Sequence, residues 1–173
     1  MNAEKLRVAV IGVGHLGEYH VQKYKAIPGV ELVGVVDVNR ARASEIGERY
    51  HVPSFFDHQD ILDRVDAVSL AVTTEMHFHV AKDILSRGIH MLIEKPITYD
   101  LHDADTLIDM AKKHDLVFQV GLVERFNPAI VQMESLLSKP VFIEAHRMNL
   151  FAKRGLDVDV VLDLMIHDLD IIL

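Results

Sequence analysis

Short apolar runs alternate with longer amphipathic segments over the first 121 residues of this 173-residue chain. Runs rich in Val, Ile and Leu predict buried strands at 6–12, 31–36, 66–72, 89–93 and 116–120, with a short strand near 55–56. Helical patterns follow them at 15–27, 40–50, 60–62, 75–87 and 101–114. Because parallel strands need a crossover between them, this order predicts an α/β fold, a doubly wound parallel sheet with helices on both faces.

The pattern changes after Gly121. A helix is expected over about 127–138, an alternating strand over 141–149 and a helical segment from about 158. We therefore expect a dinucleotide-binding domain at 1–121 and the incomplete start of an α+β substrate domain at 122–173. The chain ends on the apolar run DLDIIL without a capping glycine, which favours a fragment of a longer protein.

Composition excludes several classes of protein. With 18 Lys and Arg against 26 Asp and Glu, the net charge is −8, so no basic excess is available to bind duplex nucleic acid. The absence of cysteine excludes disulfides and thiolate chemistry and favours a reducing cytoplasm. No apolar stretch approaches the roughly 20 residues of a membrane span, so no membrane partner is expected.

The segment Gly12–Gly17 has the pattern G-x-G-x-x-G between a predicted strand and a predicted helix. In that context Gly12 permits a tight turn, Gly14 lets backbone approach a pyrophosphate, and Gly17 allows the helix to pack closely on the strand. His15 and Leu16 begin the helix, whose free amides would face the anion. The segment predicts a dinucleotide-binding loop.

Asp37 ends the second predicted strand, twenty residues after Gly17. A carboxylate at this position accepts hydrogen bonds from the adenosine ribose and repels a 2′-phosphate, so NAD is favoured. Asn39 and Arg40 follow and are counted with the cofactor-binding residues. Because Arg40 could stack on adenine or attract a phosphate, NADP stays open.

Further motifs occur in a fixed order after the glycine loop and Asp37. They are VTTEMH at 72–77, EKPIT at 94–98, ERFNPA at 124–129 and LDLMIHDLD at 162–170. Together these segments closely resemble the glucose–fructose oxidoreductase/inositol dehydrogenase (Gfo/Idh/MocA) family from Leu6 onward. The resemblance implies an NAD(P)-dependent dehydrogenase that oxidises a ring hydroxyl of a sugar, a cyclitol or a nucleotide sugar.

The resemblance also implies roles for individual residues. It places Lys95 at the reacting hydroxyl, Glu94 near the nicotinamide ribose, and Asp163 and His167 as the D-x-x-x-H pair of the second domain. An imidazole suits the general base that must take the hydroxyl proton, and a charged lysine would stabilise developing alkoxide. Asp163, four residues before His167 on a helix, would orient the imidazole or bind a neighbouring hydroxyl.

The loop residues Thr73, Thr74 and His77 match those that line the nicotinamide and pyrophosphate side in this family. The alternate spacing of His77 and His79 is also compatible with metal binding, but no cysteine or carboxylate cluster supports it, so no metal is expected. The remaining histidines are expected on the surface.

The RFNPA and DLMIHD segments look most like those of members acting on nucleotide sugars such as UDP-N-acetylglucosamine, oxidised at carbon three. Candidate contacts to the sugar or diphosphate are Arg125, Asn127, His146, Arg147 and Arg154. Family members are about twice this length, and their second domain builds a homo-oligomer. We therefore expect this chain to bind NAD, to be weakly active or inactive alone, and to bury 141–173 by self-association.

A second hypothesis is a non-catalytic dinucleotide-binding module or redox sensor. Such a protein needs neither Lys95 nor the Asp163 and His167 pair. The presence of all three residues favours the dehydrogenase.

Overall fold

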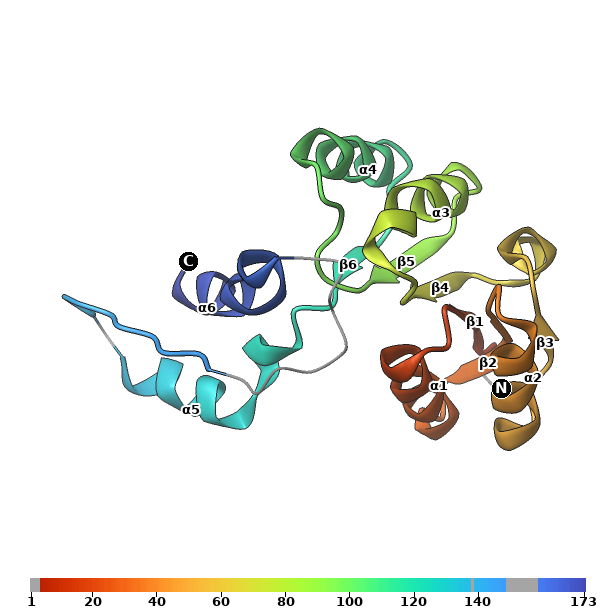
Figure 1. Ribbon diagram of the computed structural model, residues 1–173, viewed down its shortest axis with the longest axis horizontal. Helices are drawn as coiled ribbons and strands as arrows, with labels where there is room; N and C mark the ends of the chain where they lie inside the picture. The colour runs from red at the N-terminus through yellow and green to blue at the C-terminus, as the bar shows by residue number, and fades with distance from the viewer. Residues whose placement is uncertain (1–3, 138, 149–158) are drawn as a thin grey trace. The chain divides into compact units, whose positions relative to one another are not determined.

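Six strands of the first unit form one parallel sheet in the order β3-β2-β1-β4-β5-β6 (Figure 1). The sheet begins with β1 (Leu6–Ile11), and the chain crosses over to return for each later strand. The others are β2 (Val30–Val36), β3 (Ser54–Phe55), β4 (Ala67–Leu70), β5 (His90–Ile93) and β6 (Phe118–Val120). The order reverses between β1 and β4, and ligands of such sheets bind beside this switch point.

Four helices cover the two faces of this sheet in pairs (Figure 1). They are α1 (His15–Ala26), α2 (Arg40–Tyr50), α3 (Thr74–Ser86) and α4 (Leu101–Lys113). Val21 of α1 and Ile46 of α2 pack with Val10 and Val35 in one buried cluster. Side chains of α3 and α4 pack against alternate strand residues in a larger cluster that includes Ile84, Leu107, Ile11 and Leu70. Two cores on opposite faces confirm the predicted doubly wound fold.

The structure, a computed structural model, describes residues 4–137, 139–148 and 159–173. These residues divide into one compact unit that runs to Val120 and another that starts at Gly121. Short 3₁₀ turns η1 (His58–Asp60) and η2 (Leu62–Arg64) complete the first unit, where a single short helix opening at 60–62 was expected. None of the helices in the described ranges is long and apolar enough to cross a membrane.

The second unit contains a 3₁₀ turn, η3 (Val123–Phe126), and the helix α5 (Pro128–Leu136). A π-helical turn, η4 (Val161–Met165), then leads into α6 (Ile166–Ile172). The strand predicted at 141–149 is wrong for residues 141–148, which have no regular structure, while Asn149 lies outside the described residues. Alternating apolar side chains make a strand only where another strand completes the hydrogen bonds, and the described part of this unit contains none.

Candidate functional site

The turn after β1 and the first turn of α1 contain three glycines in different environments. Gly12 adopts a φ of 84°, and a Cβ there would lie 2.6 Å from the carbonyl carbon of Ala71. A Cβ on Gly17 would collide with the carbonyl oxygen of Gly12. A Cβ on Gly14 would meet nothing within 4 Å. Gly12 and Gly17 therefore serve the turn itself, whereas Gly14 faces open space.

Helix α1 begins at this turn with unsatisfied amides. Its N-cap, Gly14, has no side chain to cap it, and Glu18 donates to the Gly14 carbonyl at 3.1 Å. The amides of His15, Leu16 and Gly17 therefore have no acceptor within the helix. The side chains of His15 and Leu16 are exposed, so the helix start is accessible to an anion.

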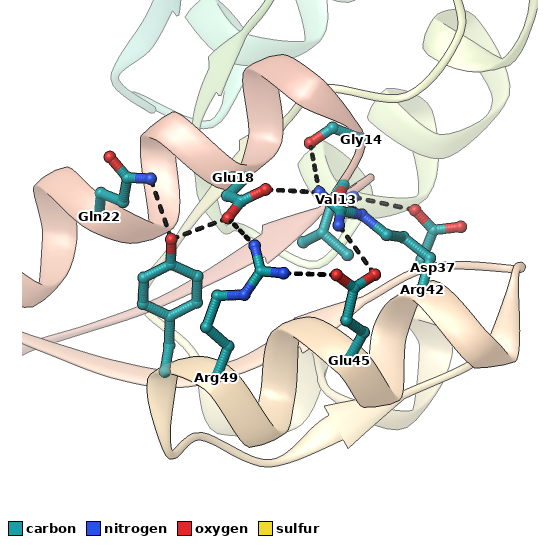
Figure 2. Close-up of polar contacts among 9 residues, drawn as sticks. Val13, Gly14, Glu18, Gln22, Asp37, Arg42, Glu45 and Arg49 are labelled. Carbon is teal, nitrogen blue, oxygen red and sulfur yellow. Dashed lines mark hydrogen bonds and ion pairs between the residues drawn. The ribbon is translucent and has the colours of Figure 1, made fainter.

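Asp37 follows β2 and lies beside the glycine turn (Figure 2). Its Oδ2 accepts from the amide of Val13 at 3.0 Å, and its Oδ1 accepts from the amide of Asn39 at 2.9 Å. Each oxygen keeps a second lone pair, so the carboxylate is fixed in place and can still accept hydroxyl hydrogen bonds.

The two residues named with Asp37 have partners of their own. Asn39 caps α2, because its Oδ1 accepts from the amide of Arg42 at 3.2 Å. The guanidinium of Arg40 lies 4.5 Å from the ring centre of Phe56, a cation–π contact. A cofactor contact by Asn39 or Arg40 stays a prediction.

An ionic network that the sequence analysis missed joins α1 to α2 and to the glycine turn (Figure 2). Arg42 donates through Nε to the carbonyl of Val13 at 2.8 Å and through Nη2 to Glu18 at 2.6 Å. Arg49 bridges Glu18 and Glu45, with both distances 2.5 Å. The hydrogen bond from Arg42, followed by those from Tyr50 and Arg49, lowers the pKa of Glu18 to about 2.

His77 connects the two loops that leave β4 and β5. Its ring is buried, with Nδ1 2.9 Å from the carbonyl oxygen of Pro96 and Nε2 3.2 Å from that of Val72. Both nitrogens thus face backbone carbonyls, and a cofactor contact by this residue stays a prediction. Of the neighbouring threonines, Thr73 is exposed at the N-cap of α3 and Thr74 is buried in its first turn.

Glu94 and Lys95 follow β5, at the carboxyl edge of the sheet. The Glu94 carboxylate is 10% exposed and pairs through Oε1 with Nε2 of His20 at 2.9 Å. Nδ1 of His20 contacts the hydroxyl of Ser69, a fully buried residue of β4. The expectation that His20 is a surface residue is wrong, because its side chain is only 15% exposed. The His20 side chain leaves α1 toward Ser69 of β4 and Glu94, which follows β5.

The second unit holds the other two residues expected to act in catalysis. Asp163 lies in the π-turn η4 and His167 lies in α6, so one continuous helical segment carries both. Asp159 begins this segment, since its Oδ1 accepts from the amides of Val161 and Leu162 at 3.0 Å each. Both Asp163 and His167 are half-buried.

The candidate substrate residues of this unit are engaged internally. Nε of Arg125 donates to Asp170 at 3.0 Å, and Nη2 of Arg147 donates to Asp168 at 2.8 Å. Asn127 caps α5 by accepting from the amide of Ala129 at 3.0 Å. His146 pairs with Glu144 at 2.8 Å, and Arg154 lies outside the described residues. Within the described ranges, no group of three or more His, Asp or Glu forms a metal site.

Comparison with known proteins gives a consistent result. Residues 6–122 match the Gfo/Idh/MocA model, described as an oxidoreductase family with an NAD-binding Rossmann fold. UDP-N-acetylglucosamine 3-dehydrogenase of Acidithiobacillus ferrooxidans is 45% identical over 169 residues, which are 97% of this chain and 53% of that protein. An NAD(+)-dependent scyllo-inositol 2-dehydrogenase of Bacillus subtilis is 26% identical, covering 96% of this chain and 53% of its own length.

Solved structures of similar fold include proteins of the same kinds. The Acidithiobacillus enzyme superposes with a TM-score of 0.90 at 45% identity, covering 96% of this chain and 55% of that one. GenD2 from gentamicin A biosynthesis, solved in complex with NAD, gives a TM-score of 0.75 at 27% identity, covering 79% of this chain and 40% of its own. The chain thus spans about half the length of the curated relatives that it matches most fully.

Proposed function

The chain belongs to the Gfo/Idh/MocA oxidoreductase family, and we propose that it provides the NAD-binding part of a dehydrogenase acting on a ring hydroxyl. One observation carries the proposal. The open turn at Gly14, the free amides of α1 and the fixed carboxylate of Asp37 lie together beside the switch point. These three features match a pyrophosphate and an adenosine ribose.

The same geometry favours NAD over NADP. The carboxylate of Asp37 repels a 2′-phosphate, and Arg42 is already bound to Val13, Glu18 and Glu45. Arg40 lies over Phe56. The two arginines nearest to Asp37 in the sequence are therefore engaged within the protein, which leaves the carboxylate to set the preference.

For the chemistry, we assign three roles. Bound NAD would supply the hydride acceptor. His167 takes the hydroxyl proton, Asp163 orients the imidazole or binds a neighbouring hydroxyl, and Lys95 stabilises the developing alkoxide. The division into a cofactor domain at 1–121 and the start of a substrate domain at 122–173 belongs to this proposal, as does assembly into a homo-oligomer.

The proposed substrate class is a nucleotide sugar such as UDP-N-acetylglucosamine, oxidised at carbon three. The name of the 45% identical relative supports it. Arg125 and Arg147 offer guanidinium groups at the surface of the second unit that a diphosphate could recruit from their aspartate partners. Inositols and hexoses are the competing substrates that any test must include.

The test measures absorbance at 340 nm with NAD and a panel of UDP-sugars, inositols and hexoses, alongside calorimetric binding of NADH. Because the 173-residue chain is expected to be weakly active or inactive alone, turnover of the variants is measured in a full-length enzyme. There Lys95→Ala and His167→Ala should each lower turnover by about a hundredfold or more while NADH affinity changes little. Turnover that is unchanged in His167→Ala contradicts its role as base. A chain that binds no NADH contradicts the cofactor assignment.

A further inference from the structure

A line of polar side chains crosses the interior of the first unit from α1 to the carboxyl edge of the sheet. The hydroxyl of Ser69 contacts Nδ1 of His20, and Nε2 of His20 pairs with Glu94 at 2.9 Å. Ser69 is fully buried, and the side chains of His20 and Glu94 are 15% and 10% exposed. Neither the glycine motif nor the family match assigns His20 a role.

The direction of these hydrogen bonds follows from the groups themselves. A carboxylate only accepts, so Nε2 of His20 carries its hydrogen in either charge state of the ring. The Ser69 hydroxyl can donate to Nδ1 of a neutral ring. The ring of His20 is therefore held from both sides and presents one N–H to Glu94.

This arrangement gives a partner to only one of the two oxygens of the Glu94 carboxylate. His20 contacts Oε1, and Oε2 accepts no hydrogen bond from the residues that the structure describes. This oxygen is not among the buried atoms without a partner, so solvent reaches it, and a donor from outside the described chain could replace that solvent. A ligand hydroxyl in the crevice beside the switch point would be such a donor.

The position of Glu94 identifies which hydroxyl this is. Asp37 follows β2 and Glu94 follows β5, with β1 and β4 between them, so three strand spacings of about 14 Å in total separate the two strand ends. The glycine turn that receives the pyrophosphate follows β1, between these two carboxylates. A dinucleotide has a ribose on each side of its pyrophosphate. With Asp37 on the adenosine ribose, Glu94 faces the other one.

We propose that His20 is a positioning residue for the dinucleotide: it holds Oε1 of Glu94 so that Oε2 accepts a hydrogen bond from the ribose on the nicotinamide side. The inference rests on the proposed function, because it needs a bound dinucleotide. It adds a residue of α1, fixed by Ser69, to the cofactor site.

The test compares two substitutions in the full 173-residue chain. His20→Gln keeps an amide N–H near the position of Nε2, whereas the shorter side chain of His20→Asn can reach Ser69 but not Glu94. Binding of NADH is measured by its fluorescence, and binding of AMP by competition, because AMP contains only the adenosine half. We expect His20→Asn to weaken NADH about tenfold and AMP by less than twofold, and His20→Gln to recover most of the loss.

Controls separate this role from simple support of the fold. His102→Asn makes the same substitution at an exposed histidine of α4 and should change neither affinity. If His20→Asn does not fold, Ser69→Ala, which frees Nδ1 of the ring, should weaken NADH and spare AMP. Equal losses for NADH and AMP, or no loss of NADH affinity, overturn the role of His20. Failure of the unaltered chain to bind NADH overturns the proposed function as well.

Discussion

At the scale of single residues, substitutions at Gly14 and Gly17 should have different effects: the first on cofactor binding and the second on folding. Gly14 has a φ of −62° and open space around it, so Gly14→Ala should change the free energy of unfolding by less than about 1 kcal/mol. The added methyl would stand where the pyrophosphate must approach, so NADH affinity should fall about tenfold or more. Gly17→Ala should instead unfold the turn, because its methyl collides with the backbone of Gly12.

Two measurements check this pair. Urea unfolding followed by circular dichroism gives the free energies, and NADH fluorescence gives the affinities. Gly29→Ala serves as the matched control, since an added Cβ there also meets nothing within 4 Å and the residue lies at the opposite end of α1. A Gly14→Ala chain that binds NADH normally would remove Gly14 from the proposed site.

Some residues of the candidate site can be predicted from the sequence and others cannot. The glycines and Asp37 are predictable because their spacing along the chain places them at the ends of β1 and β2. His20 and Arg42 are not, because their partners Glu94 and Glu18 are 74 and 24 positions away. Only the packing of α1 on the sheet and on α2 creates those contacts.

At the scale of elements, the ionic network makes the α1–α2 pair sensitive to acid. The pKa of Glu18 is lowered to about 2 in the folded chain, so the unfolded chain takes up the proton first as the pH falls. Its contribution to stability is therefore complete above the ordinary glutamate pKa and is lost as the pH falls through about 2. Glu18→Gln should cost roughly 1–3 kcal/mol of unfolding free energy at pH 7.

The difference between the two chains should shrink by about half by pH 3. Urea titrations of both chains between pH 7 and pH 3 measure it. Glu48→Gln, which changes an exposed residue of α2, is the control and should give a small difference that does not vary in this way. A Glu18→Gln difference that stays constant with pH would contradict the proposed charge on Glu18.

The elements themselves were predictable where local pattern and packing agree. In the first unit each predicted strand and each long helix forms within about two residues of its expected ends, because a sheet covered by helices on both faces requires continuous apolar runs in its strands. The strand at 141–149 was not predictable in this way. The pattern VFIEAHRMN alternates, but alternation states which face is apolar and not whether a partner strand exists.

At the scale of the whole molecule, the two units differ in how well they bury apolar side chains. The first unit has two closed cores, whereas the second exposes Val141, Phe142 and Met148 almost fully, at 101%, 81% and 91%. Large exposed apolar patches on a protein promote association. We therefore expect the 173-residue chain to self-associate through the second unit at micromolar concentration, with a sedimentation coefficient that rises with concentration.

Replacing Val141 and Phe142 together with lysine should shift this equilibrium toward monomer, because two charges would have to be desolvated in the interface. Replacing Leu101 and Val117 with lysine adds the same charge at two exposed apolar positions of the first unit and should leave the association unchanged. Sedimentation velocity over a hundredfold concentration range compares the three chains. A concentration-independent monomer for the unaltered chain would show that the exposed side chains are tolerated in water. Equal effects of the two lysine pairs would show that net charge, and not the apolar surface of the second unit, governs association.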